Sequence, residues 1–210
     1  MSTWTCRVAA LLLAALTLAG CDEATGLPFA GEFGAQSDED AHARMAQVRL
    51  GAGEIVLAAP EGYCFDRRSV RRSGSEGFAM MARCDTLGVR GFFGTQPLAI
   101  VTVTTAPWTP GDKLPTTADI ARSAGSAKVL DTARGEGLVL ARLPDGPKPL
   151  EDVSSTHWRG VFLVGRHMVA VGLYAPNGSR ALGRDGARLL TGLSARTRSA
   201  SATLTAGKAQ

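Results

Sequence analysis

The feature that most constrains the fold is a β-hairpin predicted over residues 156–174. Two apolar runs flank Gly165-Arg166, and a glycine in the first position of a two-residue turn is typical of a type II′ hairpin. The turn sets Val164 opposite His167, and the two-residue period of a strand then fixes every later pair. The face expected to enter the core consists of Trp158, Phe162, Val164, Val169, Val171 and Leu173. The opposite, mixed face consists of His157, Arg159, Leu163, Met168 and Tyr174.

Further strands and two helices are predicted around this hairpin. The strands are apolar or β-branched segments bounded by Pro or Gly, at residues 54–58, 78–84, 98–104, 128–133 and 137–143, the last two forming a pair. One helix is predicted at 116–124, with Thr116 as its N-cap. The other, at 185–196, follows from a stripe of Leu182, Leu189, Leu190 and Leu193. This order predicts a single α+β domain, in which an antiparallel meander packs on one side against a short helix and a C-terminal helix.

The N-terminus has the pattern of an export signal. Arg7 precedes an apolar run over 8–18 that is too short to span a bilayer as a mature helix. The run ends in Leu18-Ala19-Gly20-Cys21, which resembles the lipobox of bacterial lipoproteins at all four positions. The resemblance implies that residues 1–20 are a signal peptide cleaved after Gly20, and that Cys21 carries lipid, with palmitate among its acyl chains. An ordinary signal peptide followed by a chance cysteine is the alternative.

A lipid on Cys21 implies a protein anchored in the bacterial cell envelope and facing the periplasm. Residues 21–45 are expected to form an acidic tether, because they carry six acidic side chains, a single arginine and no periodic apolar face. Residues 46–198 are expected to form the globular domain. The small and polar residues 199–210 are expected to be a disordered tail.

Two cysteines remain for the folded domain, Cys64 and Cys84. Because an exported chain enters an oxidising compartment, these two are expected to form a disulfide. The bridge closes a loop of about 20 residues, which stabilises the fold by about 3 kcal/mol in the chain-entropy model. Two buried free thiols are the alternative.

Motifs for catalysis and for metal binding are absent from the sequence. It contains no Gly-x-Ser-x-Gly, Ser-x-x-Lys or His-Glu-x-x-His pattern. In the predicted register His157 and His167 lie on opposite faces of the hairpin, so they cannot share a metal ion. The expectation is therefore a protein that is not an enzyme and holds no metal or cofactor. The alternative is an envelope enzyme with a dispersed site, in which His157 is the base beside a Ser, Asp or Glu.

The densest charge cluster is Arg67, Arg68, Arg71 and Arg72. Guanidinium groups bind phosphates and carboxylates with two parallel hydrogen bonds, so this cluster is a candidate anion-binding site. In the envelope the available anions are lipid headgroups and acidic glycans, and no nucleic-acid partner is expected. The competing interpretation is a solvated loop.

The order of elements also resembles a known group. A strand that leads into Pro60-Glu61-Gly62-Tyr63, a long meander and a terminal helix with a Leu-Leu pair resemble the PsbP-like group, which includes bacterial envelope lipoproteins of the DcrB type. The resemblance implies an accessory or ligand-binding role without shared catalytic residues. The leading hypothesis is thus a lipid-anchored envelope protein with a non-catalytic binding, accessory or scaffold role, whose partner is an envelope protein, an anionic lipid or a glycan.

Overall fold

The computed structural model describes residues 44–87, 99–147 and 152–208. The predicted signal peptide, Cys21 and nearly all of the predicted tether lie outside these ranges. Within them, no helix is both long enough and apolar enough to cross a membrane.

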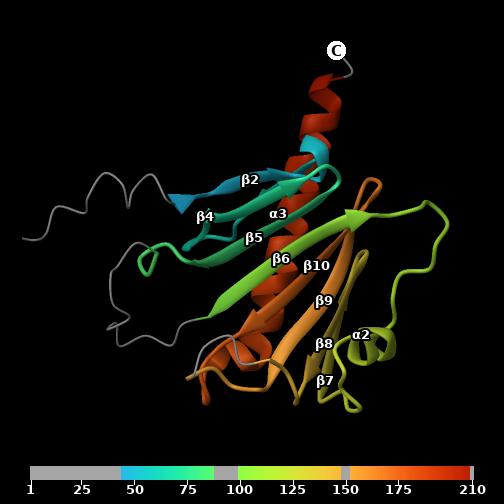
Figure 1. The fold of residues 1–210 in the computed structure, drawn as a ribbon. Coiled ribbons are helices and arrows are strands. Elements are labelled where there is room, and N and C mark those ends of the chain that lie inside the picture. The colour runs from blue at the N-terminus through green and yellow to red at the C-terminus, as the bar shows by residue number, and fades with distance from the viewer. Residues whose placement is uncertain (1–43, 88–98, 148–151, 209–210) are drawn as a thin grey trace, which may run out of the picture. The chain divides into compact units, whose positions relative to one another are not determined.

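Eight antiparallel strands form the central sheet, in the order β1-β4-β5-β6-β10-β9-β8-β7 (Figure 1). The strands are β1 (Arg44–Met45), β4 (Tyr63–Ser73), β5 (Glu76–Arg83), β6 (Ile100–Pro107), β7 (Asp131–Gly135), β8 (Leu138–Leu143), β9 (His157–Val164) and β10 (His167–Tyr174). Strands β4 to β6 pair in chain order, and so do strands β7 to β10. They form two meanders that meet where β10 pairs with β6, and β1 adds to the outer side of β4.

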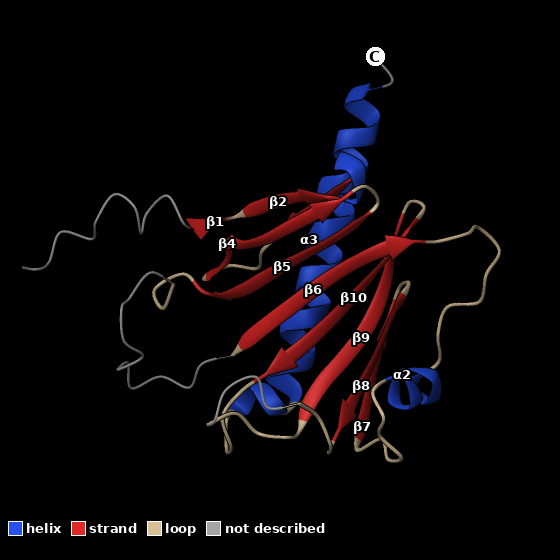
Figure 2. Ribbon diagram, viewed as in Figure 1, coloured by secondary structure: helices blue, strands red, loops and turns tan. Residues whose placement is uncertain are grey.

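Helices lie on both faces of the sheet (Figure 2). The long helix α3 (Arg184–Lys208) crosses one face, together with a second, two-stranded sheet of β2 (Gln47–Leu50) and β3 (Ile55–Ala58). The short helix α2 (Thr117–Ser123) covers β8 and β9 on the other face through Ile120 and Ala121. Two one-turn 3-10 helices, η1 (Gly51–Gly53) and η2 (Arg180–Leu182), complete the described elements. The predicted α+β fold is therefore confirmed, but the expectation that both helices cover one side of the sheet is wrong.

The hairpin of β9 and β10 has the predicted register. Val164 pairs with His167, Phe162 with Val169, and Trp158 with Leu173. Gly165 has φ +57°, a left-handed conformation that a glycine adopts without strain. The predicted core face is confirmed as well, because all six of its side chains are buried in the cluster beneath α3.

Strand β4 differs most from the sequence-based expectation. It runs over Tyr63–Ser73 and includes the arginine cluster, for which the sequence predicted no strand. Four residues of β4 stand between the paired positions Asp66 and Arg71, whereas one residue of β5 stands between their partners. The hydroxyl of Ser69 fills this bulge, since it accepts a hydrogen bond from the Met80 amide at 2.8 Å and donates to the Asp66 carbonyl at 2.7 Å. A side chain thus satisfies backbone groups that regular strand pairing would otherwise join.

The expectation of a disordered tail from residue 199 is wrong, because α3 continues to Lys208. Polar side chains hold this part of the helix against β3. The Thr197 hydroxyl accepts a hydrogen bond from the Ala58 amide at 3.2 Å, and the Ser201 hydroxyl accepts one from the Val56 amide at 2.9 Å. Both amides face away from β2, so the helix closes the outer edge of the small sheet. The tether boundary also shifts slightly, because Arg44 and Met45 form β1.

The predicted disulfide is present. Cys64 on β4 and Cys84 after β5 are bonded, with their Cα atoms 4.9 Å apart. Beside the bridge, Arg83 donates two hydrogen bonds to the carboxylate of Asp85, at 2.7 and 3.1 Å. These hydrogen bonds lower the pKa of Asp85 below its usual value. The disulfide therefore ties the end of β5 to the start of its neighbour β4.

Candidate functional site

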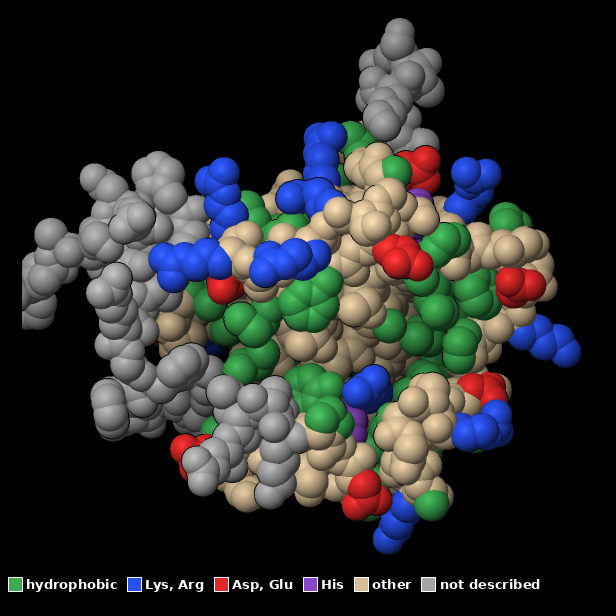
Figure 3. Space-filling model, viewed as in Figure 1, with side chains coloured by type: hydrophobic (Ala, Val, Ile, Leu, Met, Phe, Trp, Pro, Cys, Tyr) green, Lys and Arg blue, Asp and Glu red, His purple; other side chains and the backbone are tan. Residues whose placement is uncertain are grey.

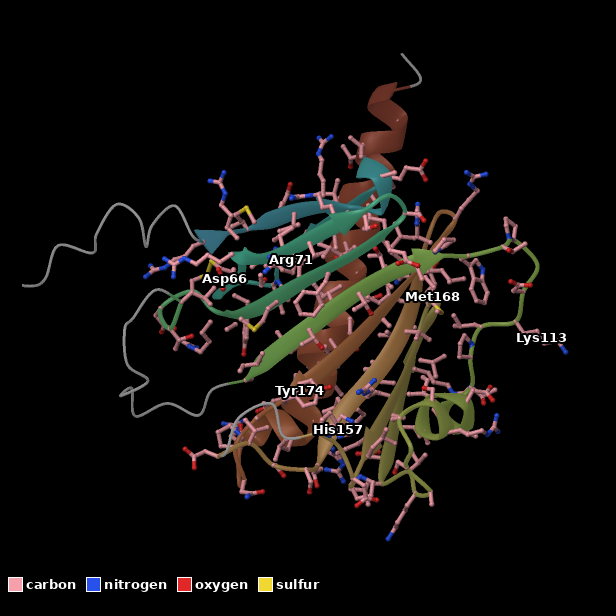
Figure 4. The ribbon with its side chains drawn as sticks, in the orientation of Figure 1. Asp66, Arg71, Lys113, His157, Met168 and Tyr174 are labelled. Carbon is pink, nitrogen blue, oxygen red and sulfur yellow. A yellow bond between two sulfur atoms is a disulfide. The ribbon has the colours of Figure 1, made fainter. Side chains whose placement is uncertain are left out.

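The predicted candidate base, His157, is a buried core residue. Its ring has no solvent exposure and stacks on Tyr174, with ring centroids 5.4 Å apart (Figure 4). Nδ1 donates a hydrogen bond to the backbone carbonyl of Ser155 at 3.0 Å, and Nε2 has no hydrogen-bond partner among residues 44–87, 99–147 and 152–208. Burial lowers the pKa of His157, so the imidazole is neutral at pH 7. The Ser155 contact is made by a backbone carbonyl, so it is not the side-chain pair that the enzyme alternative requires.

The second histidine, His167, lies on the opposite face of the hairpin, as predicted. It is also buried, and its Nε2 lies 3.0 Å from a carboxylate oxygen of the half-exposed Glu54. His167 comes from the start of β10, whereas Glu54 follows η1, so this contact joins the tip of the hairpin to the turn before β3. In the described part of the chain, no group of three or more His, Cys, Asp or Glu side chains could hold a metal ion.

The arginine cluster lies at an edge of the main sheet. Arg67, Arg68, Arg71 and Arg72 are all exposed on β4, whose outer neighbour among the described residues is the two-residue β1. Figure 3 shows basic side chains gathered over β4 and the elements beside it. The fold adds Arg49 of β2 to this group, because Nε of Arg72 donates to the Arg49 carbonyl at 2.9 Å. We call these five residues the arginine edge.

The arginine edge is partly organised by its own backbone. Nη1 of Arg71 donates to the carbonyls of Arg68, at 2.7 Å, and Val70, at 3.1 Å. Asp66 accepts a hydrogen bond from the Arg68 amide at 2.9 Å. The guanidinium of Arg71 is therefore held against the bulge, and the sequence alone gave no indication of this arrangement. Figure 4 shows Asp66 and Arg71 close together on β4.

A groove that the sequence did not predict lies between the tip of the β9–β10 hairpin and the C-terminal half of α3. Its volume is about 840 Å³. The residues that line it are Glu54, Leu163, Val164, Gly165, Arg166, His167, Arg198, Ser201, Ala202, Leu204 and Ala206. We call this feature the hairpin groove. The one signal in the sequence was the change along α3 from leucines to Ala, Ser and Thr.

The predicted site residues that the structure describes therefore lie in separate parts of the fold and do not form one site. Cys21 lies outside the described residues, so its lipidation stays a prediction. Cys64 and Cys84 form the disulfide, the four arginines lie at the sheet edge, and His157 is in the core.

Comparison of the chain with protein-family models, with curated proteins and with solved structures finds no match.

Proposed function

We propose that this chain is a lipid-anchored protein of the bacterial cell envelope, facing the periplasm, with a non-catalytic binding or accessory role. The observation that carries the proposal is the Cys64–Cys84 disulfide. Disulfides form and persist in oxidising compartments such as the periplasm, so this bond favours an exported protein. It agrees with the export and lipidation that the lipobox-like Leu18-Ala19-Gly20-Cys21 implies. The hairpin groove gives a binding role a site whose volume is within the usual range for small ligands.

Labelling with a palmitate analogue tests the anchor directly. The full-length chain should incorporate the label and fractionate with membranes, and Cys21→Ala should abolish both. Cys6→Ala is the matched control, because this cysteine lies within the predicted signal peptide and should not affect labelling. Label that persists in Cys21→Ala contradicts the proposal, as does a soluble chain that keeps its first methionine.

The arginine edge favours a second candidate function, binding of anionic lipid headgroups. The specific observation is that Arg49, which is distant in sequence, lies beside the cluster of β4. Several arginines on one surface attract an anionic membrane, and this attraction weakens with salt. Full-length Cys21→Ala should therefore bind phosphatidylglycerol vesicles in a salt-dependent manner. Reversal of charge at Arg67 and Arg71 should remove this binding, and unchanged binding would eliminate the candidate.

A further inference from the structure

We propose that the hairpin groove binds a single-chain amphiphile with a carboxylate head, that is, a long-chain fatty acid. The proposal deepens the binding role proposed above, and it does not depend on lipidation of Cys21. The walls of the groove would hold the alkyl chain, and the arginines at its rim would hold the carboxylate.

The groove exists because the side chains of α3 become small along its length. In the first half of the helix, Leu190 and Leu193 are fully buried and fill the space beneath the sheet. In the second half the buried positions are Thr197 and Ser201, whose hydroxyls accept hydrogen bonds from the β3 backbone. These short side chains do not reach the hairpin tip, so a space remains where a close-packed protein would place larger side chains.

The uncharged lining is suited to an alkyl chain. Apolar side chains come from both walls, namely Leu163 and Val164 of the hairpin and Ala202, Leu204 and Ala206 of α3. Ser201 contributes a side-chain hydroxyl to the described lining. This hydroxyl accepts a hydrogen bond from the Val56 amide and donates one to the Thr197 carbonyl.

The charged lining determines which head group is favoured. Arg166 and Arg198 are the cations, and Glu54 is the acid. Glu54 lies 3.0 Å from Nε2 of His167, so the hairpin tip holds its carboxylate. Nη1 of Arg198 donates to the carbonyl of Glu136, and its other guanidinium N–H groups provide additional donors. The two arginines outnumber the one acid, and this excess of positive charge complements a carboxylate.

Photo-crosslinking of the full-length Cys21→Ala chain tests the proposal, because this variant has no acyl chain of its own. The probe is palmitic acid with a diazirine near the end of its chain, and the labelled residues are mapped by mass spectrometry. We expect labels on the hairpin tip at 163–167 and on α3 at 202–206. Ala202→Trp should reduce these labels about tenfold, because the indole occupies the groove. Since Ala202 is exposed, this variant should fold, and Ala206→Trp is a second variant of the same kind.

A charge variant separates binding of the head from binding of the chain. Arg166→Gln should weaken labelling by the fatty acid about tenfold, the usual effect of losing a hydrogen bond to a charged group. It should leave labelling by the corresponding fatty alcohol unchanged. Arg122→Gln is the matched control, because Arg122 is an exposed arginine on α2, away from the groove.

Two outcomes overturn the proposal. One is labelling of the hairpin and α3 that is equal in the parent chain and in both tryptophan variants. The other is labelling confined to the apolar segment 8–18, which would show that the probe binds there and not in the groove. Neither outcome bears on palmitate labelling of Cys21, so the anchor and the groove can fail independently.

Discussion

Two glycines of α3 should respond in opposite directions to substitution by alanine. A Cβ at Gly186 would overlap the backbone carbonyl oxygen of Ala181 in η2 and would lie 3.2 Å from Cδ1 of Trp158. Neither group can move easily. The Ala181 oxygen belongs to the backbone, and the Trp158 indole is held by the hydrogen bond that it donates to the Gly183 carbonyl. A Cβ at Gly192, in contrast, would have Pro60 Cγ as its nearest neighbour, at 4.0 Å, which is an ordinary contact.

The magnitudes follow from these contacts. Alanine is about 1 kcal/mol more favourable than glycine inside a helix, so Gly192→Ala should raise Tm by about 2–4 °C. Overpacking costs about 1–3 kcal/mol, so Gly186→Ala should lower Tm by about 2–12 °C.

Thermal unfolding followed by circular dichroism measures both variants under the same conditions. The two changes have the same chemistry and lie on the same helix, so their difference isolates the contact with η2. A shift of the same sign in both variants would refute the packing of α3 against η2 described above.

Three further predictions concern stability. Thr197→Val should lower the free energy of unfolding, measured in urea, by about 1–3 kcal/mol, because it leaves the buried Ala58 amide without an acceptor. Thr191→Val is the control, because Thr191 is exposed, and it should change the free energy of unfolding little. Burial lowers the pKa of His157, so the unfolded chain takes up a proton below about pH 6.5 before the folded protein does. Stability should therefore fall as the pH drops below about 6.5, by up to about 1.4 kcal/mol per pH unit, and His157→Phe should flatten this slope. Removal of the disulfide in the double variant Cys64→Ala/Cys84→Ala should cost about 3 kcal/mol, and an unchanged urea midpoint would contradict its role.

The β9–β10 hairpin could be predicted residue by residue because its information is local. The two-residue turn at Gly165 sets the register, and strand alternation then assigns every side chain to a face. The N-terminus of α2 is local in the same way. The predicted N-cap Thr116 accepts a hydrogen bond from the Asp119 amide, and the Asp119 carboxylate accepts one from the Thr116 amide.

Strand β4 could not be predicted, because its signal is not local. Arginines occupy four of the six positions from Arg67 to Arg72, so neither alternation nor an apolar run is visible. The bulge between Asp66 and Arg71 also interrupts the two-residue alternation of side chains along the strand. Pairing with β5, together with the Ser69 hydroxyl that fills the bulge, makes this segment a strand.

The hairpin groove depends on contacts between distant parts of the chain. Its walls come from the β9–β10 turn and from α3, and the polar C-terminal residues become helical where Thr197 and Ser201 meet β3. A sequence of small polar residues is typical of a disordered tail, and only the position of β3 makes a packed helix of it. Cys21, in contrast, was predicted from a sequence motif alone, and its role stays a prediction.

The arginines of β4 also affect how copies of this protein meet. β1 pairs with Phe65 and Asp66 only, so the rest of the outer side of β4 has no paired strand among the described residues. An open strand of this length is a template for sheet extension from one molecule to the next, which leads to fibres. Here the bulge interrupts the template, and the repulsion between like charges keeps a second β4 away. Replacing Arg67 and Arg71 with threonine should therefore promote self-assembly into polymers, even if the fold itself stays intact.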